Sequence, residues 1–439
     1  MARPRKRKVL GVWMNGLRVG RWSLEPTGEH VFAYAADWLA RPEARPLSLS
    51  MPMRSNAPYR SAVVESWFDN LLPDSRAIRQ RIQSRFRAAS LQAFDLLEEI
   101  GRDCVGAVQL LPEDREPEDM RQIRGEPLSE SAIAALLRTT TVAGAEDESS
   151  DFRISLAGAQ EKTALLWHRG GWQRPLGATP STHIFKLPMG RVGNFQGDLS
   201  TSVENEWLCS QLVAALGLPI AKTEIGKFED QKALIVERFD RRPSADGSYW
   251  LRLPQEDLCQ ALDVPPALKY EADGGPGPVR IMDLLLGSQQ AAEDRALFLK
   301  SLFVFWLLCA TDGHAKNYSI AIEPEGRFRL TPLYDVISVW PLIGHGKNQL
   351  AVERAKMAMA AVSKNRHYHW IKIQTRHWQS TAAACGFAPE AMKRLIDQVL
   401  AEVEPAIDKV TTGLPADFPE HVAAAIFRGL RQAVRKLGG

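Results

Sequence analysis

The sequence predicts an α+β fold with two domains, an N-terminal α/β domain over residues 1–145 and a second domain over 146–439. The length of 439 residues allows about two to three structural units at about 150 residues each. The acidic, serine-rich segment AGAEDESSD at 143–151 is typical of a linker. Strand patterns dominate from about 151 to 245 and helical patterns from about 250 to 439. We therefore expect a second domain of two lobes, the first β-rich and the second all helical.

The charge distribution disfavours a protein that binds nucleic acid over its whole surface. The net charge is +3, and five positive side chains lie within the first eight residues, which leaves −2 for the rest of the chain. A nearly neutral body has no broad basic surface, although local basic patches remain possible.

The apolar runs and the cysteines indicate in which cell compartment the protein acts. The longest apolar run, 302–310, has nine residues, and a membrane-spanning helix needs about 20. The five cysteines are at least 50 residues apart, so no CxxC motif exists. Scattered single cysteines are typical of reduced thiols, and we expect a cytoplasmic protein without a membrane contact.

In the N-terminal domain, residues 9–35 predict strands, with a hairpin turn at Asn15-Gly16. A helical pattern follows over 61–89 and is interrupted at Pro73. Its second half, 76–87, contains five arginines and no acidic residue, so we expect a basic surface there.

The β-rich lobe has a regular order of patterns. FRISLAG and KTALLW predict two strands around a glycine turn, and THIFKLP predicts a third. VENEWLCSQLVAALGL predicts an amphipathic helix that ends at Gly217. ALIVERFDR then predicts a strand that leaves this lobe.

The helical lobe begins with a helix that we expect to be buried. Residues 295–310 are apolar nearly all round, which favours a helix inside the core. The polar loop TDGHAKN follows, and YSIAIE and RFRLTPLYD predict a hairpin after it. Residues 370–436 predict two or three further helices.

The order of parts from 151 to 335 is the one that phosphoryl transfer from ATP requires. Asp312 and Asn317 have the D-x-x-x-x-N spacing of a protein-kinase catalytic loop. Asp312 would orient an acceptor hydroxyl and accept its proton, while Asn317 and Asp335 would hold Mg²⁺ through oxygen atoms. Read alone, the D-x-x-x-x-N spacing can arise by chance, and it favours a polar loop that caps the buried helix over a catalytic loop.

Lys186, in the short apolar strand HIFKLP, would neutralise ATP phosphates. Glu206 and Glu204 on the following helix are rival partners for its charge, and an edge-strand lysine that faces water is the alternative. The segment 155–162, with the single glycine Gly158, would cover the phosphates, although an ordinary hairpin turn has the same local pattern.

Residues Glu237, Arg238 and Phe239 lie where the chain leaves the β-rich lobe. Their backbone would bind adenine and Phe239 would pack on the base, unless this is simply a buried strand end.

Long strings of the sequence resemble the HipA family of serine/threonine kinases, the toxins of type II toxin–antitoxin modules. They run in the same order through most of the chain: RPLSLSMP (45–52), FDNLLPDS (68–75), EIGRDCVGAVQL (99–110), DFRISLAGAQEKTALL (151–166), THIFKLP (182–188), VERFDRR (236–242), LRLPQEDLCQ (251–260), KYEADGGPG (269–277), ATDGHAKN (310–317), LTPLYDVIS (330–338) and LPADFPE (414–420).

The resemblance implies an N-terminal α/β domain before a kinase-like domain with a helical C-terminal part. It implies Asp312 as the catalytic base and Ser155 as a site of autophosphorylation that inactivates the enzyme. A phosphate of about −1.5 to −2 charge at Ser155 would disturb a loop that must hold ATP phosphates. The residues that the resemblance places around Mg-ATP are Ala157, Gly158, Ala159, Gln160, Glu161, Lys162, Lys186, Glu237, Arg238, Phe239, His314, Ala315, Lys316, Asn317, Tyr334 and Asp335.

The resemblance also implies partners. The expected substrate is an aminoacyl-tRNA synthetase, glutamyl-tRNA synthetase first, whose phosphorylation would stop translation and growth. The expected partner is a HipB-like helix-turn-helix antitoxin, with which the chain would act as corepressor. The stretch TAAACGF (381–387), where relatives touch operator DNA, has no positive charge. We therefore expect DNA contact mainly through the antitoxin, and only locally through 76–87 or 364–376.

Two other functions are compatible with the same parts. One is a kinase-fold corepressor with little catalysis, which would have no need to retain Lys186, Asp312, Asn317 and Asp335 together. The other is a small-molecule kinase, which the long N-terminal domain disfavours.

Overall fold

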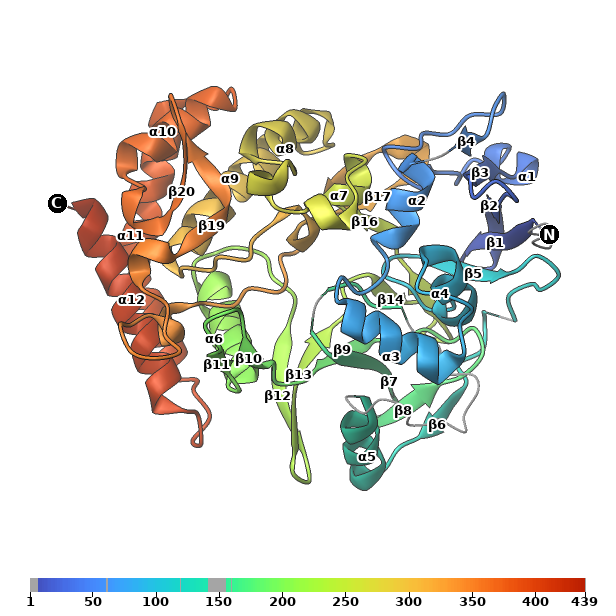
Figure 1. Cartoon of the computed structure of the whole chain (residues 1–439), viewed down its shortest axis with the longest axis horizontal. Helices are drawn as coiled ribbons and strands as arrows, with labels where there is room; N and C mark the ends of the chain where they lie inside the picture. Colours follow the sequence, from blue (N-terminus) through green and yellow to red (C-terminus); the bar gives the residue numbers. More distant parts are fainter. Residues whose placement is uncertain (1–6, 61, 119, 141–154, 159, 439) are drawn as a thin grey trace, which may run out of the picture.

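The computed structural model describes residues 7–60, 62–118, 120–140, 155–158 and 160–438. Figure 1 shows an elongated molecule with the N-terminal domain at one end, the last two helices at the other, and a sheet and helices between them. The α+β class expected from the sequence is confirmed.

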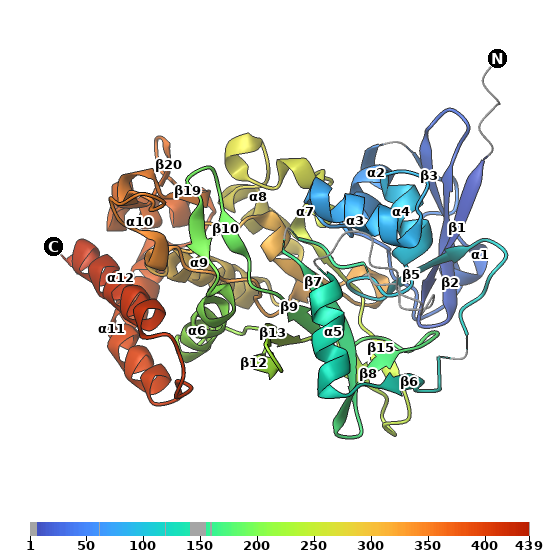
Figure 2. The ribbon, with the colours of Figure 1, turned by 60° about the horizontal axis from the view of Figure 1, so that its bottom comes forward.

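The N-terminal domain is an antiparallel sheet with helices on one face (Figure 2). Its strands, in the order β4-β3-β2-β1-β5, are β1 (Lys8–Met14), β2 (Leu17–Leu24), β3 (His30–Tyr34), β4 (Tyr59–Arg60) and β5 (Val108–Pro112). Its helices are α1 (Ala36–Leu39), α2 (Ala62–Asp69), α3 (Arg76–Phe86) and α4 (Ala93–Ile100). The break between α2 and α3 falls at Pro73, as expected.

Local chemistry explains this sheet. Asn15 and Gly16 adopt φ values of 47° and 81°, which a two-residue type I′ hairpin requires and which these residue types tolerate. The predicted hairpin between β1 and β2 is confirmed. The apolar faces of sheet and helices meet in one core, where the rings of Trp22 and Phe68 stack with centroids 3.9 Å apart.

A six-stranded sheet forms the middle of the molecule, in the order β12-β13-β9-β7-β8-β6. Its strands are β6 (Gly125–Pro127), β7 (Lys162–His168), β8 (Gly171–Pro175), β9 (His183–Lys186), β12 (Thr223–Phe228) and β13 (Gln231–Glu237). Helix α5 (Glu130–Thr140) packs on Ala233 and Ile235 of β13, and α6 (Ser202–Ala215) packs beside Leu234 and Val236. Because consecutive residues of a strand point to opposite faces, these two helices cover opposite faces of the sheet.

The segment 125–140 belongs to this middle layer. Strand β6 pairs with β8, and α5 buries Ile133, Leu136 and Leu137 against the six-stranded sheet. The sequence places these residues in the N-terminal domain, with the boundary at 143–151, a segment that lies outside the described residues. The packing differs because β6 and α5 find their apolar partners only on the second sheet.

The predicted strand FRISLAG is not formed in its described part. Residues 155–157 form no strand, and Gly158 forms a single parallel bridge with Pro73 of the N-terminal domain. The other predicted elements of this lobe are confirmed as β7, β9, α6 and β13. Gly217 follows α6 with φ of 73°, the left-handed conformation of a helix end.

The third layer is mainly helical. Its helices are α7 (Leu258–Ala261), α8 (Pro278–Leu284), α9 (Ala291–Leu307), α10 (Thr375–Ala384), α11 (Pro389–Thr411) and α12 (Glu420–Gly438). The buried helix is confirmed as α9, in which Phe298, Phe303 and Trp306 are fully buried. The rings of Trp306 and Trp370 stack, and each indole donates a hydrogen bond to the other residue's carbonyl oxygen, at 3.1 Å and 2.8 Å.

Short strands accompany these helices, so the lobe is not all helical. The predicted hairpin is β17 (Ser319–Ile322) and β18 (Phe328–Leu330), and β16 (Gln255–Asp257) joins it. A second hairpin, β19 (Lys356–Val362) with β20 (Arg366–His369), was not expected. Further two-stranded pairs are β10 (Gly190–Val192) with β11 (Gly197–Leu199), and β14 (Arg241–Pro243) with β15 (Trp250–Arg252).

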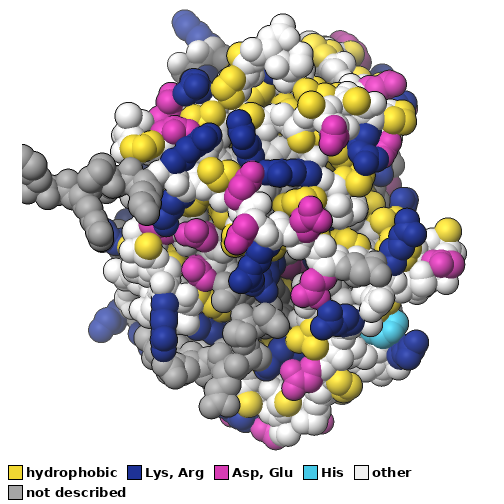
Figure 3. Space-filling view, turned by 90° about the vertical axis from the view of Figure 1, so that its right-hand side faces the viewer, with side chains coloured by type: hydrophobic (Ala, Val, Ile, Leu, Met, Phe, Trp, Pro, Cys, Tyr) yellow, Lys and Arg dark blue, Asp and Glu magenta, His cyan; other side chains and the backbone are white. Residues whose placement is uncertain are grey.

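The surface of the N-terminal end agrees with the nearly neutral body. Figure 3 shows positive and negative side chains interspersed over this face. The basic surface expected over 76–87 is partly neutralised, because Arg79 pairs with Asp69 at 2.6 Å and Arg81 pairs with Glu161. Among the described residues, no helix is long and apolar enough to cross a bilayer. The five cysteines are all buried thiols.

Candidate active site

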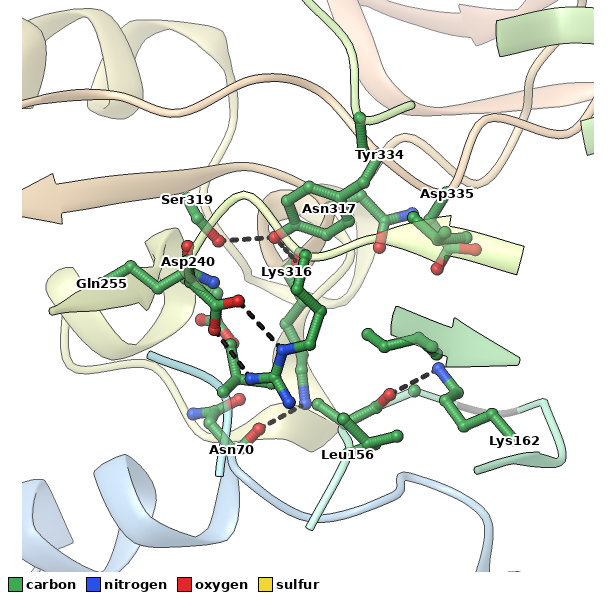
Figure 4. Close-up of a pocket in the computed structure, with 18 of the residues that line it drawn as sticks. Asn70, Leu156, Lys162, Asp240, Gln255, Lys316, Asn317, Ser319, Tyr334 and Asp335 are labelled. Atoms are coloured by element: carbon green, nitrogen blue, oxygen red, sulfur yellow. Dashed lines mark hydrogen bonds and ion pairs between the residues drawn. The ribbon is translucent and has the colours of Figure 1, made fainter. Parts of the chain in front are cut away.

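A cleft of about 1040 Å³, partly open to solvent, lies where the six-stranded sheet, the helical lobe and the N-terminal domain meet. The sequence-predicted residues that line it are Ala157, Gly158, Lys162, Lys186, Glu237, Arg238, Phe239, Asp312, His314, Lys316, Asn317, Tyr334 and Asp335. They come from segments up to 178 positions apart in the chain. Figure 4 shows several of them converging on one space.

Lys186 stands at the centre of an ion-pair chain. At the end of β9, its Nζ donates to Oε1 of Glu206 on α6 at 2.5 Å and to Oδ1 of Asp335 at 2.7 Å. Glu204, the rival partner, pairs instead with Lys232. Lys186 is therefore a partnered, buried lysine, and the alternative of a lysine facing water is excluded.

The ion pairs keep Lys186 and Asp335 in their charged forms. Burial alone would lower the pKa of Lys186, but the carboxylates of Asp335 and Glu206 outweigh it and raise this pKa above its usual value. Burial alone would raise the pKa of Asp335, but Lys186 and then Lys162 hold it well below its usual range. Asp335 has φ of 62°, a conformation that costs energy for a residue other than glycine and that the surrounding structure must enforce.

Asp312 lies at the mouth of the cleft, with 60% of its side chain exposed. The hydroxyl of Tyr270 donates to its Oδ1, and the side-chain amide of Asn317 donates to its backbone carbonyl at 2.7 Å. The surrounding cleft raises the pKa of Asp312, which the hydrogen bond from Tyr270 opposes. The loop is thus held from both ends, with the carboxylate facing solvent and the cleft.

His314 and Lys162 flank this centre. Burial lowers the pKa of His314 to about 3, so its imidazole is neutral at pH 7. The Nζ of Lys162 donates to the carbonyl of Ala157 at 2.6 Å, and Lys162 is directly opposite Lys186 in the sheet. Burial, and then the charge of Lys186, lower the pKa of Lys162 to about 8. Two lysines therefore face one end of the cleft.

The inner end of the cleft is apolar. Ile184, Ala221, Val236 and Phe239 line it, and the ring of Tyr334 lies 5.9 Å from that of Phe239. The side chain of Arg238 turns away into a buried pair with Asp240, whose two oxygens accept at 3.0 Å and 2.8 Å. Aliphatic and aromatic side chains at this end of the cleft suit a planar base, while the amides of Glu237 and Arg238 already donate to the carbonyls of Lys222 and Thr182.

Some predicted residues lie elsewhere. Ser155 is fully buried, and its hydroxyl donates to the carbonyl of Leu71 at 2.8 Å. Gln160 hydrogen-bonds the carbonyl of Leu187, and Glu161 pairs with Arg81 outside the cleft. Ala315 is buried in the helical core. Ala159 lies outside the described residues.

The structure adds site residues that the sequence reasoning did not single out. Asn70, Leu71 and Asp74 of the N-terminal domain line the cleft, as does Lys269, and the neighbouring Tyr270 reaches Asp312. Their signal was present, because both groups lie inside the strings FDNLLPDS and KYEADGGPG. Nothing in the spacing of those strings indicates which loop they would approach.

The donor set at the cleft fits a magnesium nucleotide. Asn317 and Asp335 offer amide and carboxylate oxygens, which Mg²⁺ prefers, and phosphates and water complete its shell. Within the ranges that the structure describes, no group of three histidine, cysteine, aspartate or glutamate side chains could hold a metal.

A β-rich lobe and a helical lobe on either side of a cleft that holds a lysine–glutamate pair and an Asp/Asn loop define a protein-kinase-like fold. More particularly, the chain belongs to the HipA family, the family of HipA-like serine/threonine kinase toxins. The model of the HipA-like C-terminal domain matches residues 154–407, and that of the HipA N-terminal domain matches 10–111.

Relatives cover nearly the whole chain. Y4mE of Sinorhizobium fredii, a kinase by its provisional name, is 32% identical over 92% of both chains. The serine/threonine-protein kinase toxin HipA of Shewanella oneidensis is 28% identical over 76% of both. A solved complex of HipA, HipB and operator DNA from Shewanella oneidensis contains a chain of the same fold, with a TM-score of 0.79, 24% identity, and coverage of 97% of this chain and 96% of that one.

Proposed function

We propose that the chain is an ATP-dependent protein serine/threonine kinase that acts as the toxin of a toxin–antitoxin pair. The observation that carries this proposal is the buried chain Glu206–Lys186–Asp335, which shares one cleft with Asp312 and Asn317. Burial of the three charges of Glu206, Lys186 and Asp335 costs desolvation energy. A corepressor without catalysis would gain nothing from that cost beside a cleft of this size.

Each part of the cleft would have its own role in phosphoryl transfer. The apolar slot beside Phe239 would hold the adenine, while Lys186 and Lys162 would face its phosphates. Asn317 and Asp335 would hold Mg²⁺, which supplies charge neutralisation of the phosphates. Asp312 would accept the proton of a serine or threonine hydroxyl as that oxygen attacks the γ-phosphorus and ADP leaves. Its exposure at the mouth leaves room for a protein acceptor.

Ser155 is proposed as a self-inactivating phosphorylation site. Its hydroxyl is buried against Leu71, so it must leave this position before it can accept a phosphate. A phosphoserine could not return, because a doubly charged group does not fit a fully buried site whose described partner for the hydroxyl is the carbonyl oxygen of Leu71.

Incubation of the purified chain with labelled Mg-ATP tests the enzyme assignment. We expect label at Ser155, and we expect Asp312→Asn and Asp335→Asn to lower the labelling rate at least on the order of 10²-fold, because each removes a group used in transfer. Asp283→Asn, an exposed change on α8, should keep the wild-type rate. Full labelling in both site variants would contradict the proposal.

The substrate and partners are proposed from the family alone. A HipA of this fold was solved with HipB and operator DNA, and we propose a HipB-like antitoxin that carries this chain to its operator. We propose an aminoacyl-tRNA synthetase, glutamyl-tRNA synthetase first, as the substrate. Phosphopeptide mass spectrometry after induction of the wild type and of Asp312→Asn should reveal a synthetase phosphopeptide only with the wild type. A metabolite labelled in place of protein would favour a small-molecule kinase.

A further inference from the structure

The N-terminal domain reaches into the cleft through the turn between α2 and α3. Residues 70–74 lie there, and Asn70, Leu71 and Asp74 line the cleft. The backbone of this turn bonds to the segment that would cover the phosphates, because Pro73 bridges Gly158 and the amide of Asp74 donates to the carbonyl of Gly158 at 3.1 Å. A domain outside the kinase-like fold thus forms one wall of the candidate active site.

The carboxylate of Asp74 binds two lysines of the helical lobe. Its Oδ1 accepts from Lys316 Nζ at 2.8 Å, and its Oδ2 accepts from Lys269 Nζ at 2.8 Å. The three side chains are 16%, 3% and 14% exposed, so this bridge is largely shielded from water. Burial alone would raise the pKa of Asp74, but the two lysines lower it to about 2. Asp74 is therefore charged at every physiological pH.

Both lysines lie next to residues that the proposed chemistry uses. Lys316 precedes Asn317, and its Nζ also donates to the carbonyl of Asn70 at 3.3 Å. Lys269 precedes Tyr270, whose hydroxyl donates to Asp312, and the carbonyl of Lys269 accepts from the amide of Ala315. One carboxylate of the N-terminal domain thereby holds both segments that place Asp312 and Asn317.

We propose that Asp74 is a positioning residue for phosphoryl transfer, supplied by the N-terminal domain. Asp74 links the loop 312–317 and the segment 269–270 to the turn that bonds Gly158. Asp312, which would bind the acceptor hydroxyl, is thereby held at a fixed position relative to the segment that would cover the phosphates. Asp74 also offsets one of two lysine charges at the edge of the cleft, which would otherwise draw the phosphates toward Lys316 and Lys269. The inference rests on the proposed kinase function.

A purely structural link between domains makes a different prediction from a positioning role. Loss of a link lowers stability and weakens nucleotide binding and turnover together. Loss of a positioning charge lowers turnover while nucleotide binding stays the same or becomes tighter, because two unneutralised lysines attract phosphates. The ratio of these effects separates the two roles.

The test uses the full chain with Asp74→Asn and the matched control Asp69→Asn. Asp69 is the last residue of α2, pairs with Arg79 at 2.6 Å and does not line the cleft. For Asp74→Asn we expect kcat of ATP hydrolysis to fall on the order of 10²-fold, the usual cost of misplaced groups, with an equal or lower Kd for Mg-ATP by calorimetry. Asp69→Asn should keep both values.

A readout without nucleotide completes the test. Hydrogen exchange of the ligand-free protein should quicken over 312–317 in Asp74→Asn and not in Asp69→Asn, and Asp74→Glu should recover most of kcat because it keeps the charge. If Asp74→Asn does not fold, Lys269→Met breaks the same bridge from its other side. It should lower kcat and quicken exchange over 312–317, but without tighter Mg-ATP binding, because it removes a positive charge.

Unchanged kcat, or kcat and binding lost in proportion to the folded fraction, would overturn the positioning role. A wild-type chain that neither binds nor hydrolyses Mg-ATP would overturn the proposed function itself, so the two failures are distinguishable.

Discussion

His314 shows how one residue of the site depends on burial. It is 3% exposed beside Asp312, and among the described residues no partner lies within hydrogen-bond distance of its Nδ1. Burial lowers its pKa to about 3, against about 6.5 for an unfolded chain. At pH values between these two pKa values, His314 is protonated in the unfolded state and neutral in the folded state.

The free energy of unfolding should therefore decrease as the pH falls from about 6.5 toward 3. The contribution of His314 has a slope of at most about 1.36 kcal/mol per pH unit, which is the value for one proton. Denaturant unfolding at pH 4.5, 5.5 and 6.5 should show a slope shallower by up to this amount in His314→Gln than in the wild type. The exposed His421→Gln should keep the wild-type slope, and equal slopes for all three proteins would contradict the prediction.

The choice between Glu204 and Glu206 as the partner of Lys186 also depends on the position of single residues. Glu204 and Glu206 have the same chemistry and lie in one helix, so composition leaves both open. Two positions in a helix differ by about 200° around its axis, so only one of them can face β9. The register of α6 against the sheet turns Glu206 toward Lys186 and Glu204 toward Lys232, and this register depends on packing.

At the scale of elements, the reliable predictions rest on strong local signals. Asn15-Gly16, the apolar sequence of α9 and the glycine after α6 encode their structures within a few residues. The hairpin β19–β20 lacks such a signal, because its apolar run MAMAAV suits a helix as well as a strand. The strand expected in FRISLAG fails in its described part because Ser155 and Gly158 bond to the N-terminal domain and not to a neighbouring strand.

Helix α5 gives a prediction at this scale. Leu137 is fully buried against the six-stranded sheet, so Leu137→Ala should lower the free energy of unfolding by about 2–5 kcal/mol through a cavity. Hydrogen exchange should quicken in β7, β9 and β13. The exposed control Ala135→Ser should change little.

The N-terminal sheet should keep its protection in Leu137→Ala, because α5 packs on the second sheet. Loss of protection in β1–β3, with β7 and β9 unaffected, would contradict this assignment and would support the expected boundary near 146.

At the scale of the whole molecule, a buried ionic cluster joins the N-terminal domain to the strand that leaves the β-rich lobe. Asp103 binds Arg241 at 3.0 Å, Arg252 at 3.1 Å and Arg238 at 3.5 Å. Asp240 supplies the second negative charge. Burial alone would raise the pKa of Asp103, but the three arginines hold it well below its usual range. Three buried cations thus depend on two carboxylates.

Asp103→Asn should destabilise the whole chain, because it leaves three buried arginines with one carboxylate. Breaking a buried ion pair from one side costs about 3–5 kcal/mol, and denaturant unfolding measures it. Asp37→Asn makes the same charge change at an exposed position and should stay within about 0.5 kcal/mol of the wild type. A difference of less than 1 kcal/mol for Asp103→Asn would show that the cluster does not bind the domains together.

The sequence by itself determined the α+β class, the order of two lobes after an N-terminal domain, and about half of the residues that line the cleft. These features are local, because turns, helix ends and apolar periodicity act within one segment, and long strings identify the family. Only the tertiary structure decided that Glu206 is the partner of Lys186, that Ser155 is buried, and that Asp74 reaches Lys316 across 242 positions of the chain. Such contacts join segments whose separation carries no periodic signal, and they form only when the packed cores of both domains bring those segments together.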